Sequence, residues 1–159
     1  MKTLVLGLGN PLVTDDSVGL RVAAELRPLL AGRPDVEVAD DYWGGLRLME
    51  RLVGYDRAII VDAIRTGDPP GTIHRLTPDA IPTQRSASAH DVNLPTALEF
   101  GRQAGLHLPE NGDILLVGIE VEDILTFGEA CTPAVQAAVA PAVQDILRIL
   151  GSSPGDPTA

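Results

Sequence analysis

Short apolar runs alternate along this chain with longer segments of helical periodicity, and this alternation constrains the fold more than any other feature. Apolar runs of strand length predict buried strands, whereas apolar residues that recur every three or four positions predict helices with one buried face. We therefore predict an α/β fold, a three-layer sandwich in which a mostly parallel sheet has helices on both faces. The predicted strands are 3–8, 36–39, 57–62, 72–76 and 113–119, and the predicted helices are 18–30, 44–52, 90–101 and 132–150.

The length of 159 residues fits a single domain with one core. We predict that residues 1–150 form this domain and that residues 151–159 form a disordered tail. The strand at 72–76 is short and polar, so we expect it at an edge of the sheet, followed by a loop over 77–89.

The charge balance argues against several classes of partner. The chain has 22 acidic and 12 basic residues, a net charge of −10, and no basic run. Nucleic acids and anionic membranes both require clustered cations, so neither is an expected partner. We find no transmembrane run and no signal-peptide cleavage region, and the only cysteine is Cys131, so we expect a cytoplasmic protein without a disulfide framework. A monomer is the expected state.

Three ionisable residues lie just beyond predicted strands or at the start of a predicted helix. Asp16 follows the first strand, Asp62 ends the strand at 57–62, and His90 precedes the third helix. Ligands of open α/β sheets bind beyond the carboxyl ends of the strands. Two carboxylates and one imidazole could surround a divalent ion there and leave positions for water or substrate, a set that suits zinc or nickel better than magnesium.

Each of these residues also has a structural interpretation. Asp16, or its neighbour Asp15, is placed to cap the first helix, Asp62 to end a strand, and His90 to form a hydrogen bond in a first helical turn. Because separate loops impose no fixed spacing, the residues alone do not decide between a metal site and these structural roles.

Other motifs give little support to other chemistries. The segment 7–12 begins like a dinucleotide-binding loop, but Leu12 replaces the third glycine. The sequence contains no phosphate-binding loop, no His-Glu-x-x-His and no Gly-x-Ser-x-Gly. Cys131 precedes a helix and is interpreted as a packing residue in preference to a nucleophile.

Residues 4–19, which read LVLGLGNPLVTDDSVG, resemble the N-terminal signature of the hydrogenase maturation proteases. The likeness continues through IIVDA at 59–63, SAH at 88–90, LLVGI at 115–119 and TPAV at 132–135, so it covers roughly residues 2–150. This ordered set is far more specific than any one of its parts.

The resemblance implies a five-stranded twisted sheet and an endopeptidase activity. The substrate would be the large-subunit precursor of a [NiFe]-hydrogenase, whose C-terminal extension is removed after nickel insertion. Asp16, Asp62 and His90 match the family's metal-binding acid, acid and histidine. They would bind the nickel already present in the precursor, and zinc or another divalent ion could occupy the same site.

Two loops depart from the family pattern. Many members carry Asp-Gly-Gly-Thr after the second strand, whereas here Asp40 is followed by Asp41, Tyr42, Trp43 and two glycines. Many also carry proline soon after the glycine of the last strand, whereas Gly118 is followed here by residues 119–123 without proline. These departures leave open which hydrogenase is processed.

Two alternatives compete with this interpretation. A non-enzymatic metal-binding accessory protein could have the same fold and the same three ligands. A peptidyl-tRNA hydrolase begins with a motif similar to residues 7–11, but it needs a histidine shortly downstream, and residues 12–30 contain none.

Overall fold

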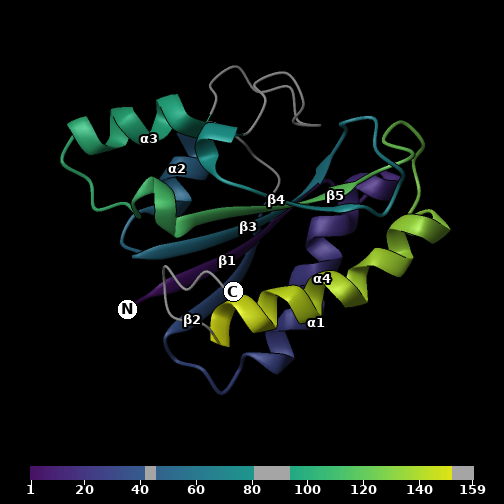
Figure 1. Ribbon diagram of the computed structural model, residues 1–159, viewed down its shortest axis with the longest axis horizontal. Coiled ribbons are helices and arrows are strands. Elements are labelled where there is room, and N and C mark those ends of the chain that lie inside the picture. The colour runs from purple at the N-terminus through teal and green to yellow at the C-terminus, as the bar shows by residue number, and fades with distance from the viewer. Residues whose placement is uncertain (42–45, 81–93, 152–159) are drawn as a thin grey trace.

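The computed structural model describes residues 1–41, 46–80 and 94–151. Over these residues the chain forms a central sheet between two layers of helices, as predicted (Figure 1). The strands are β1 (Thr3–Leu8), β2 (Val36–Asp41), β3 (Arg57–Ile64), β4 (Ile73–Leu76) and β5 (Ile114–Glu120), and the α-helices are α1 (Val18–Leu29), α2 (Leu46–Leu52), α3 (Leu94–Gln103) and α4 (Pro133–Gly151).

The five strands lie in the order β2-β1-β3-β5-β4. The first four of these are parallel, and β4 pairs antiparallel with β5 at the edge of the sheet. The predicted edge position of the strand at 72–76 is therefore confirmed. β4 is antiparallel because the short turn after β3 returns the chain beside β5 without a crossover helix.

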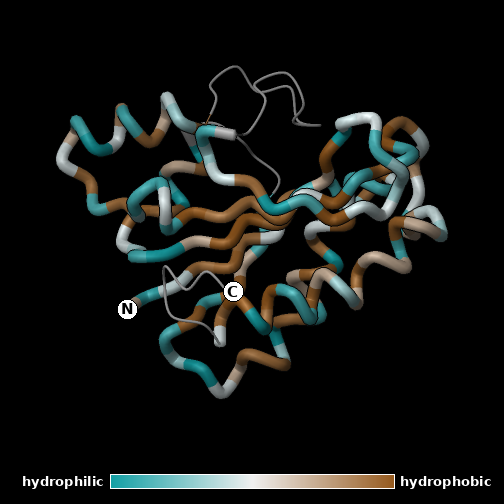
Figure 2. The backbone as a smooth tube through the Cα atoms, viewed as in Figure 1, coloured by the Kyte–Doolittle hydropathy of each residue, from teal (hydrophilic) through white to brown (hydrophobic). Residues whose placement is uncertain are grey.

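Side-chain alternation along the strands divides the core into two halves. Val5, Ile59 and Val117 point toward α1 and α4, whereas Leu6, Ile60 and Leu116 point toward α2 and α3. All six side chains are buried. Figure 2 shows the resulting concentration of hydrophobic residues in the central strands.

The start of the first long helix differs from the prediction. The chain forms a short 3-10 helix, η1 (Thr14–Ser17), before α1 begins, and the cap residue of α1 is Ser17. Neither Asp15 nor Asp16 therefore caps α1, and the sequence interpretation of either residue as its N-cap is wrong. α3 begins at Leu94 in the described residues, with Pro95 in its first turn as expected.

The last helix begins at Pro133, as predicted, and ends one residue later than expected. Gly151 belongs to α4, so the predicted tail is shortened by one residue at its start. The rest of the predicted tail, the loop positions 81–89 and the helix start near His90 lie outside the described residues. In the part of the chain that the structure describes, no helix is both long and apolar enough to cross a membrane.

The strand order creates one special position at the carboxyl edge of the sheet. The chain leaves β1 toward β2 on one side and later returns to form β3 on the other side. The connections on the two sides of this point lead away in opposite directions, and open α/β sheets bind ligands at such a point; we call this position, between the carboxyl ends of β1 and β3, the crevice. The strand order therefore places the expected ligand site at the carboxyl ends of β1 and β3.

Candidate functional site

The two predicted acidic ligands lie at this crevice. Asp62 belongs to the carboxyl-terminal part of β3, one residue beyond the pairing of Val61 with Gly7 of β1. β3 continues to Ile64, so the prediction that Asp62 ends this strand is wrong. Asp16 lies in η1, shortly after β1 ends. The two carboxylates are close enough for the charge of Asp16 to raise the pKa of Asp62. The structure thus brings together two of the three predicted site residues.

Asp62 is held in an environment that disfavours its charged form. Burial, followed by the negative charge of Asp16, raises the pKa of Asp62 from 3.8 to about 7. The backbone N–H of Ala63 donates a hydrogen bond of 2.8 Å to Asp62 Oδ1 and offsets part of this effect. A carboxyl with so perturbed a pKa in a ligand-binding crevice is a candidate for function.

Asp16 has a similar but milder environment. Burial raises its pKa, and a hydrogen bond of 3.0 Å donated by the Asn10 backbone N–H to Asp16 Oδ2 opposes the increase. Asn10 follows the Gly9 turn, so the GLGNP segment of the sequence directly positions the first acidic residue.

Two glycines allow η1 and α1 to approach the strands closely. A Cβ on Gly9, whose φ is +153°, would lie 2.0 Å from the carbonyl oxygen of Asp16. A Cβ on Gly19 would lie 2.3 Å from the carbonyl oxygen of Leu8 and 2.4 Å from that of Val61. Any larger residue would push η1 and α1 away from the ends of β1 and β3, and with them Asp16 from Asp62.

Asp15 has a different role from its neighbour Asp16. Its carboxylate is fully buried and accepts hydrogen bonds from the backbone N–H groups of Glu122 (2.9 Å), Asp123 (2.8 Å) and Thr132 (2.7 Å). It also accepts from the Thr132 hydroxyl. Asp15 therefore fastens η1 to both ends of the β5–α4 loop.

The β5–α4 loop and the segment between β1 and η1 present apolar side chains to solvent. Leu12, Leu125 and Phe127 are 60%, 85% and 81% exposed, and we call these three residues the apolar rim. Hydrogen bonds from the Gly128 N–H to the Leu12 carbonyl (3.0 Å) and a bridge between Val13 and Phe127 hold the two halves of the rim together. Exposed apolar clusters of this kind often mark binding surfaces.

An open depression lies between the turn after β1, α1 and the end of β2. It has a volume of about 260 Å³ and is lined by Gly9, Pro11, Leu20, Asp40 and Asp41. Asp40 pairs with Arg27 at 3.1 Å, and Asp41 lies 3.6 Å from Arg47, so both acidic residues have basic partners in this region.

The remaining candidates of the sequence have simpler outcomes. His90 lies outside the described residues. Cys131 packs against the core under α1 and α4, and its sulfur lies 3.7 Å from the Ser17 hydroxyl and 3.7 Å from the Thr14 carbonyl oxygen. This position agrees with the packing role expected from the sequence.

Sequence reasoning missed Asp15 and the group formed by Asp68, His74 and Glu120. Nothing local in the sequence shows that Asp15 binds residues more than 100 positions away. His74 lies within the predicted strand at 72–76, and no local sequence pattern joins it to Asp68 or Glu120.

Comparison with known proteins identifies the class to which this fold and site belong. A family model described as hydrogenase maturation protease, HycI, matches residues 20–149. The hydrogenase 2 maturation protease of Escherichia coli K12 is 34% identical over 159 residues, covering 96% of this chain and 93% of the relative. The hydrogenase expression/formation protein HupD of Thiocapsa roseopersicina is 28% identical and matches 94% of this chain and 67% of its own length.

A solved structure gives the same result. The hydrogenase maturating endopeptidase HybD from Escherichia coli superposes with a TM-score of 0.76 and 30% sequence identity, covering 95% of this chain and 93% of that one. The fold is thus that of an α/β peptidase. The chain belongs to the hydrogenase maturation protease family and is a hydrolase, an endopeptidase of hydrogenase maturation. This assignment decides against both alternatives, the accessory protein and the peptidyl-tRNA hydrolase.

Proposed function

We propose that the protein removes the C-terminal extension of a [NiFe]-hydrogenase large-subunit precursor after nickel has been inserted, and that it recognises the bound nickel. In this proposal Asp16, Asp62 and His90 bind the nickel that the precursor carries. The observation that carries the proposal is the pair of Asp16 and Asp62, two carboxylates that repel each other at the ligand-binding crevice. The role of His90 rests on its place in the sequence.

The two carboxylates suit a divalent cation. Burial and the charge of Asp16 both disfavour the ionised form of Asp62. A cation between the two side chains would favour the ionised form and lower the pKa of Asp62. Oxygen ligands from two carboxylates and nitrogen from an imidazole suit nickel or zinc, so zinc or another divalent ion is the alternative occupant. A bound divalent ion would polarise a carbonyl or activate a water molecule.

The surroundings of the pair provide surfaces for a peptide. The apolar rim is formed by Leu12 before η1 and by Leu125 and Phe127 of the β5–α4 loop, and the depression is lined by Gly9 and Pro11, which flank Asn10 in the chain. We propose that the precursor's C-terminal segment passes over these surfaces while its nickel centre contacts the carboxylates. The reaction takes place in the cytoplasm in this proposal, and the enzyme acts as a monomer that meets its precursor transiently.

The test compares nickel-loaded and nickel-free precursors of candidate large subunits, incubated with the purified enzyme. Intact mass spectrometry reports whether the C-terminal extension is lost. We expect loss from the nickel-loaded precursor alone. Equal cleavage of the nickel-free precursor would refute nickel recognition, and a cut elsewhere in the chain would refute the proposed cleavage position.

Variants of the proposed ligands sharpen this test. Asp16→Ala, Asp62→Ala and His90→Ala should each fold and yet process the precursor at least about 100-fold more slowly, because each removes a ligand outside the core. Asp35→Ala is the matched control, since Asp35 is an exposed carboxylate at the opposite edge of the sheet, before β2. Wild-type rates in all three ligand variants would remove these residues from the mechanism.

A further inference from the structure

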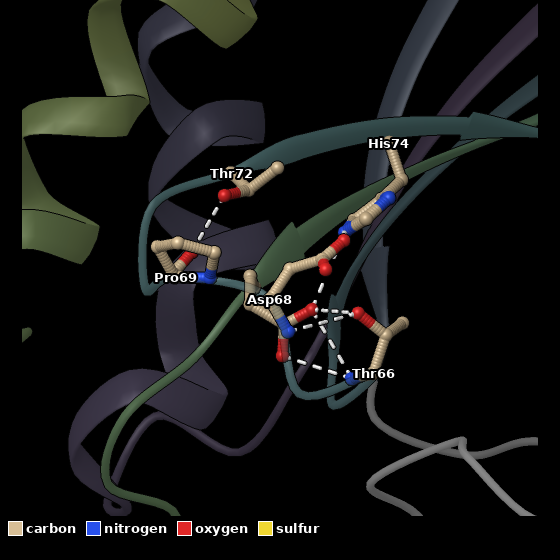
Figure 3. A network of polar contacts seen from close by, with 6 residues as sticks. Thr66, Asp68, Pro69, Thr72 and His74 are labelled. Carbon is tan, nitrogen blue, oxygen red and sulfur yellow. Dashed lines mark hydrogen bonds and ion pairs between the residues drawn. The ribbon is translucent and has the colours of Figure 1, made fainter.

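A second group of metal-ligand side chains lies where β4 begins and β5 ends. Asp68, His74 and Glu120 each offer one ligand atom, and these atoms all lie within 4.8 Å of one another. Figure 3 shows Asp68 and His74 turned toward each other, with Thr66 beside them. The imidazole comes from β4, the buried carboxylate from the last residue of β5, and the exposed carboxylate from the turn between β3 and β4.

This group is separate from the crevice that holds Asp16 and Asp62. Asp62 pairs with Gly118 of β5, and Gly118 pairs with His74 of β4, so the three residues form one row across three strands. Strands are spaced about 4.8 Å apart, which puts the backbone of His74 roughly 10 Å from that of Asp62. Ile64 packs over Gly118 between them, with its Cγ2 at 3.0 Å from the position of a Gly118 Cβ.

The distances within the group suit a bound metal ion. His74 Nε2 lies 3.2 Å from Glu120 Oε1 and 3.4 Å from Asp68 Oδ2. Ligands about 2.0–2.1 Å from a tetrahedral zinc ion are about 3.3–3.4 Å from one another. The imidazole nitrogen is therefore at ligand spacing from both carboxylates, and little movement is needed to receive an ion.

Glu120 is held in place as a charged ligand. Its side chain is 3% exposed, and the Thr66 backbone N–H donates to both of its oxygens, at 3.1 Å and 2.9 Å. Burial raises the pKa of Glu120, but hydrogen bonds from Thr66 and His74 outweigh burial and hold the pKa below its ordinary value. Carboxylates oriented by neighbouring hydrogen bonds are typical of metal ligands.

Asp68 gives the group access to solvent. Its side chain is 53% exposed, while that of His74 is 19% exposed. An ion could enter from the Asp68 side and keep water in its remaining coordination position. The structural alternative is an ion-pair group that ties the β3–β4 turn to β5 and takes up no metal.

We propose that Asp68, His74 and Glu120 form a second metal site, which binds a divalent ion of the zinc class with water as a further ligand. The site is independent of the Asp16 and Asp62 pair, so it stands or falls separately from the proposed function. It fixes the turn between β3 and β4 at the carboxyl edge of the sheet.

The test is zinc titration by isothermal calorimetry on chelator-treated full-length protein that carries Asp62→Ala, which removes the first site. We expect this variant to bind one zinc ion. Adding His74→Gln or Asp68→Asn should weaken binding at least about 10- to 100-fold, the loss caused even by removing outer partners of metal ligands. Gln keeps an N–H that can donate to Glu120, and Asp68 is exposed, so neither change should prevent folding.

His107→Gln in the same background is the matched control. His107 Nε2 lies 3.0 Å from Asp56 Oδ1, so it also pairs with a carboxylate, but it has no second one in the described part of the chain. This control should change zinc affinity less than about twofold. A thermal melt without zinc gives a second readout, because Asp68→Asn should leave it unchanged while it weakens zinc binding.

Two results would overturn the proposal. One is the absence of zinc binding by the Asp62→Ala protein. The other is binding that neither His74→Gln nor Asp68→Asn weakens. Because no precursor is cleaved in this experiment, its outcome does not depend on which hydrogenase is the substrate.

Discussion

Asp15 and Asp16 are neighbours in η1, yet their carboxylates have opposite surroundings. Asp15 is fully buried and accepts hydrogen bonds from three backbone N–H groups and one hydroxyl. Asp16 is partly buried, accepts from the single N–H of Asn10 and shares its space with a second carboxylate, Asp62. The first region is internally satisfied, and the second contains two like charges without a compensating group among the described residues.

This contrast separates structural from functional carboxylates. A buried charge that is saturated with donors stabilises the native structure, and its removal leaves those donors unpaired. A carboxylate pair with few donors is costly for the fold and is retained where a ligand supplies the missing charge. Sequence position does not distinguish the two cases, because the residues are adjacent.

The largest effect should come from Asp15→Ala, which removes the acceptor of the hydrogen bonds that anchor η1. Three buried backbone N–H groups lose their acceptor, at about 1–3 kcal/mol each, so we expect destabilisation of about 5 kcal/mol. Urea unfolding followed by circular dichroism would measure it. Glu129 is an exposed acidic residue of the β5–α4 loop, and Glu129→Ala should change the free energy of unfolding by less than about 0.5 kcal/mol. Similar stability of the two variants would contradict the anchoring role of Asp15.

The pair of Asp16 and Asp62 should make the folded protein less stable as pH rises. The pKa of Asp62 is raised from 3.8 to about 7, so the folded state binds more protons than the unfolded state between these values, and stability falls as pH rises through this window. Between pH 5 and pH 8 the metal-free protein should lose about 3 kcal/mol on this account. Asp62→Asn should abolish that loss. Unfolding curves of chelator-treated protein would check this, and an identical pH dependence in both proteins would contradict it.

A third change, Gly19→Ala, tests whether the close approach of α1 to β1 and β3 is needed to hold η1 at the strand ends. Gly19→Ala places a methyl group against the carbonyl oxygens of Leu8 and Val61, so α1 must move. We expect a loss of about 2 kcal/mol, as in other overpacked sites, together with slower processing. Gly32→Ala is the matched control, because a Cβ there meets nothing within 4 Å. If both variants kept wild-type stability, close approach at Gly19 would not matter.

The smallest effect should come from removing the charge repulsion between Asp16 and Asp62. Asp16→Asn removes one charge of the pair and should lower the pKa of Asp62, a change worth roughly 1 kcal/mol. The pKa should stay above 3.8, because burial is the larger cause of its increase. Carboxyl carbon chemical shifts of metal-free protein, followed against pH, would measure it. An unchanged Asp62 titration would show that the two carboxylates do not interact.

The sequence predicted the repeating parts of the fold more successfully than the connections. β3 and β5 were predicted because their apolar runs are long and uninterrupted, and Asp62 could be placed because it ends such a run. η1 was not predicted, since four residues of 3-10 helix have no periodicity to detect. The partners of Asp15 and Glu120 depend on contacts between residues 46 to 117 positions apart, and no local pattern records these contacts.

The position of β5 has a consequence for how a newly made chain acquires its shape. β4 is synthesised well before β5, yet β5 lies between β3 and β4 in the sheet. During translation β4 therefore has no strand partner until residues 114–120 have left the ribosome. The hydrogen bond from the Thr132 N–H to Asp15 can form only after Thr132 has been synthesised as well. Formation of such distant contacts is slow. The nascent enzyme should consequently resist proteases, and become able to cut its own target, only when synthesis is nearly complete.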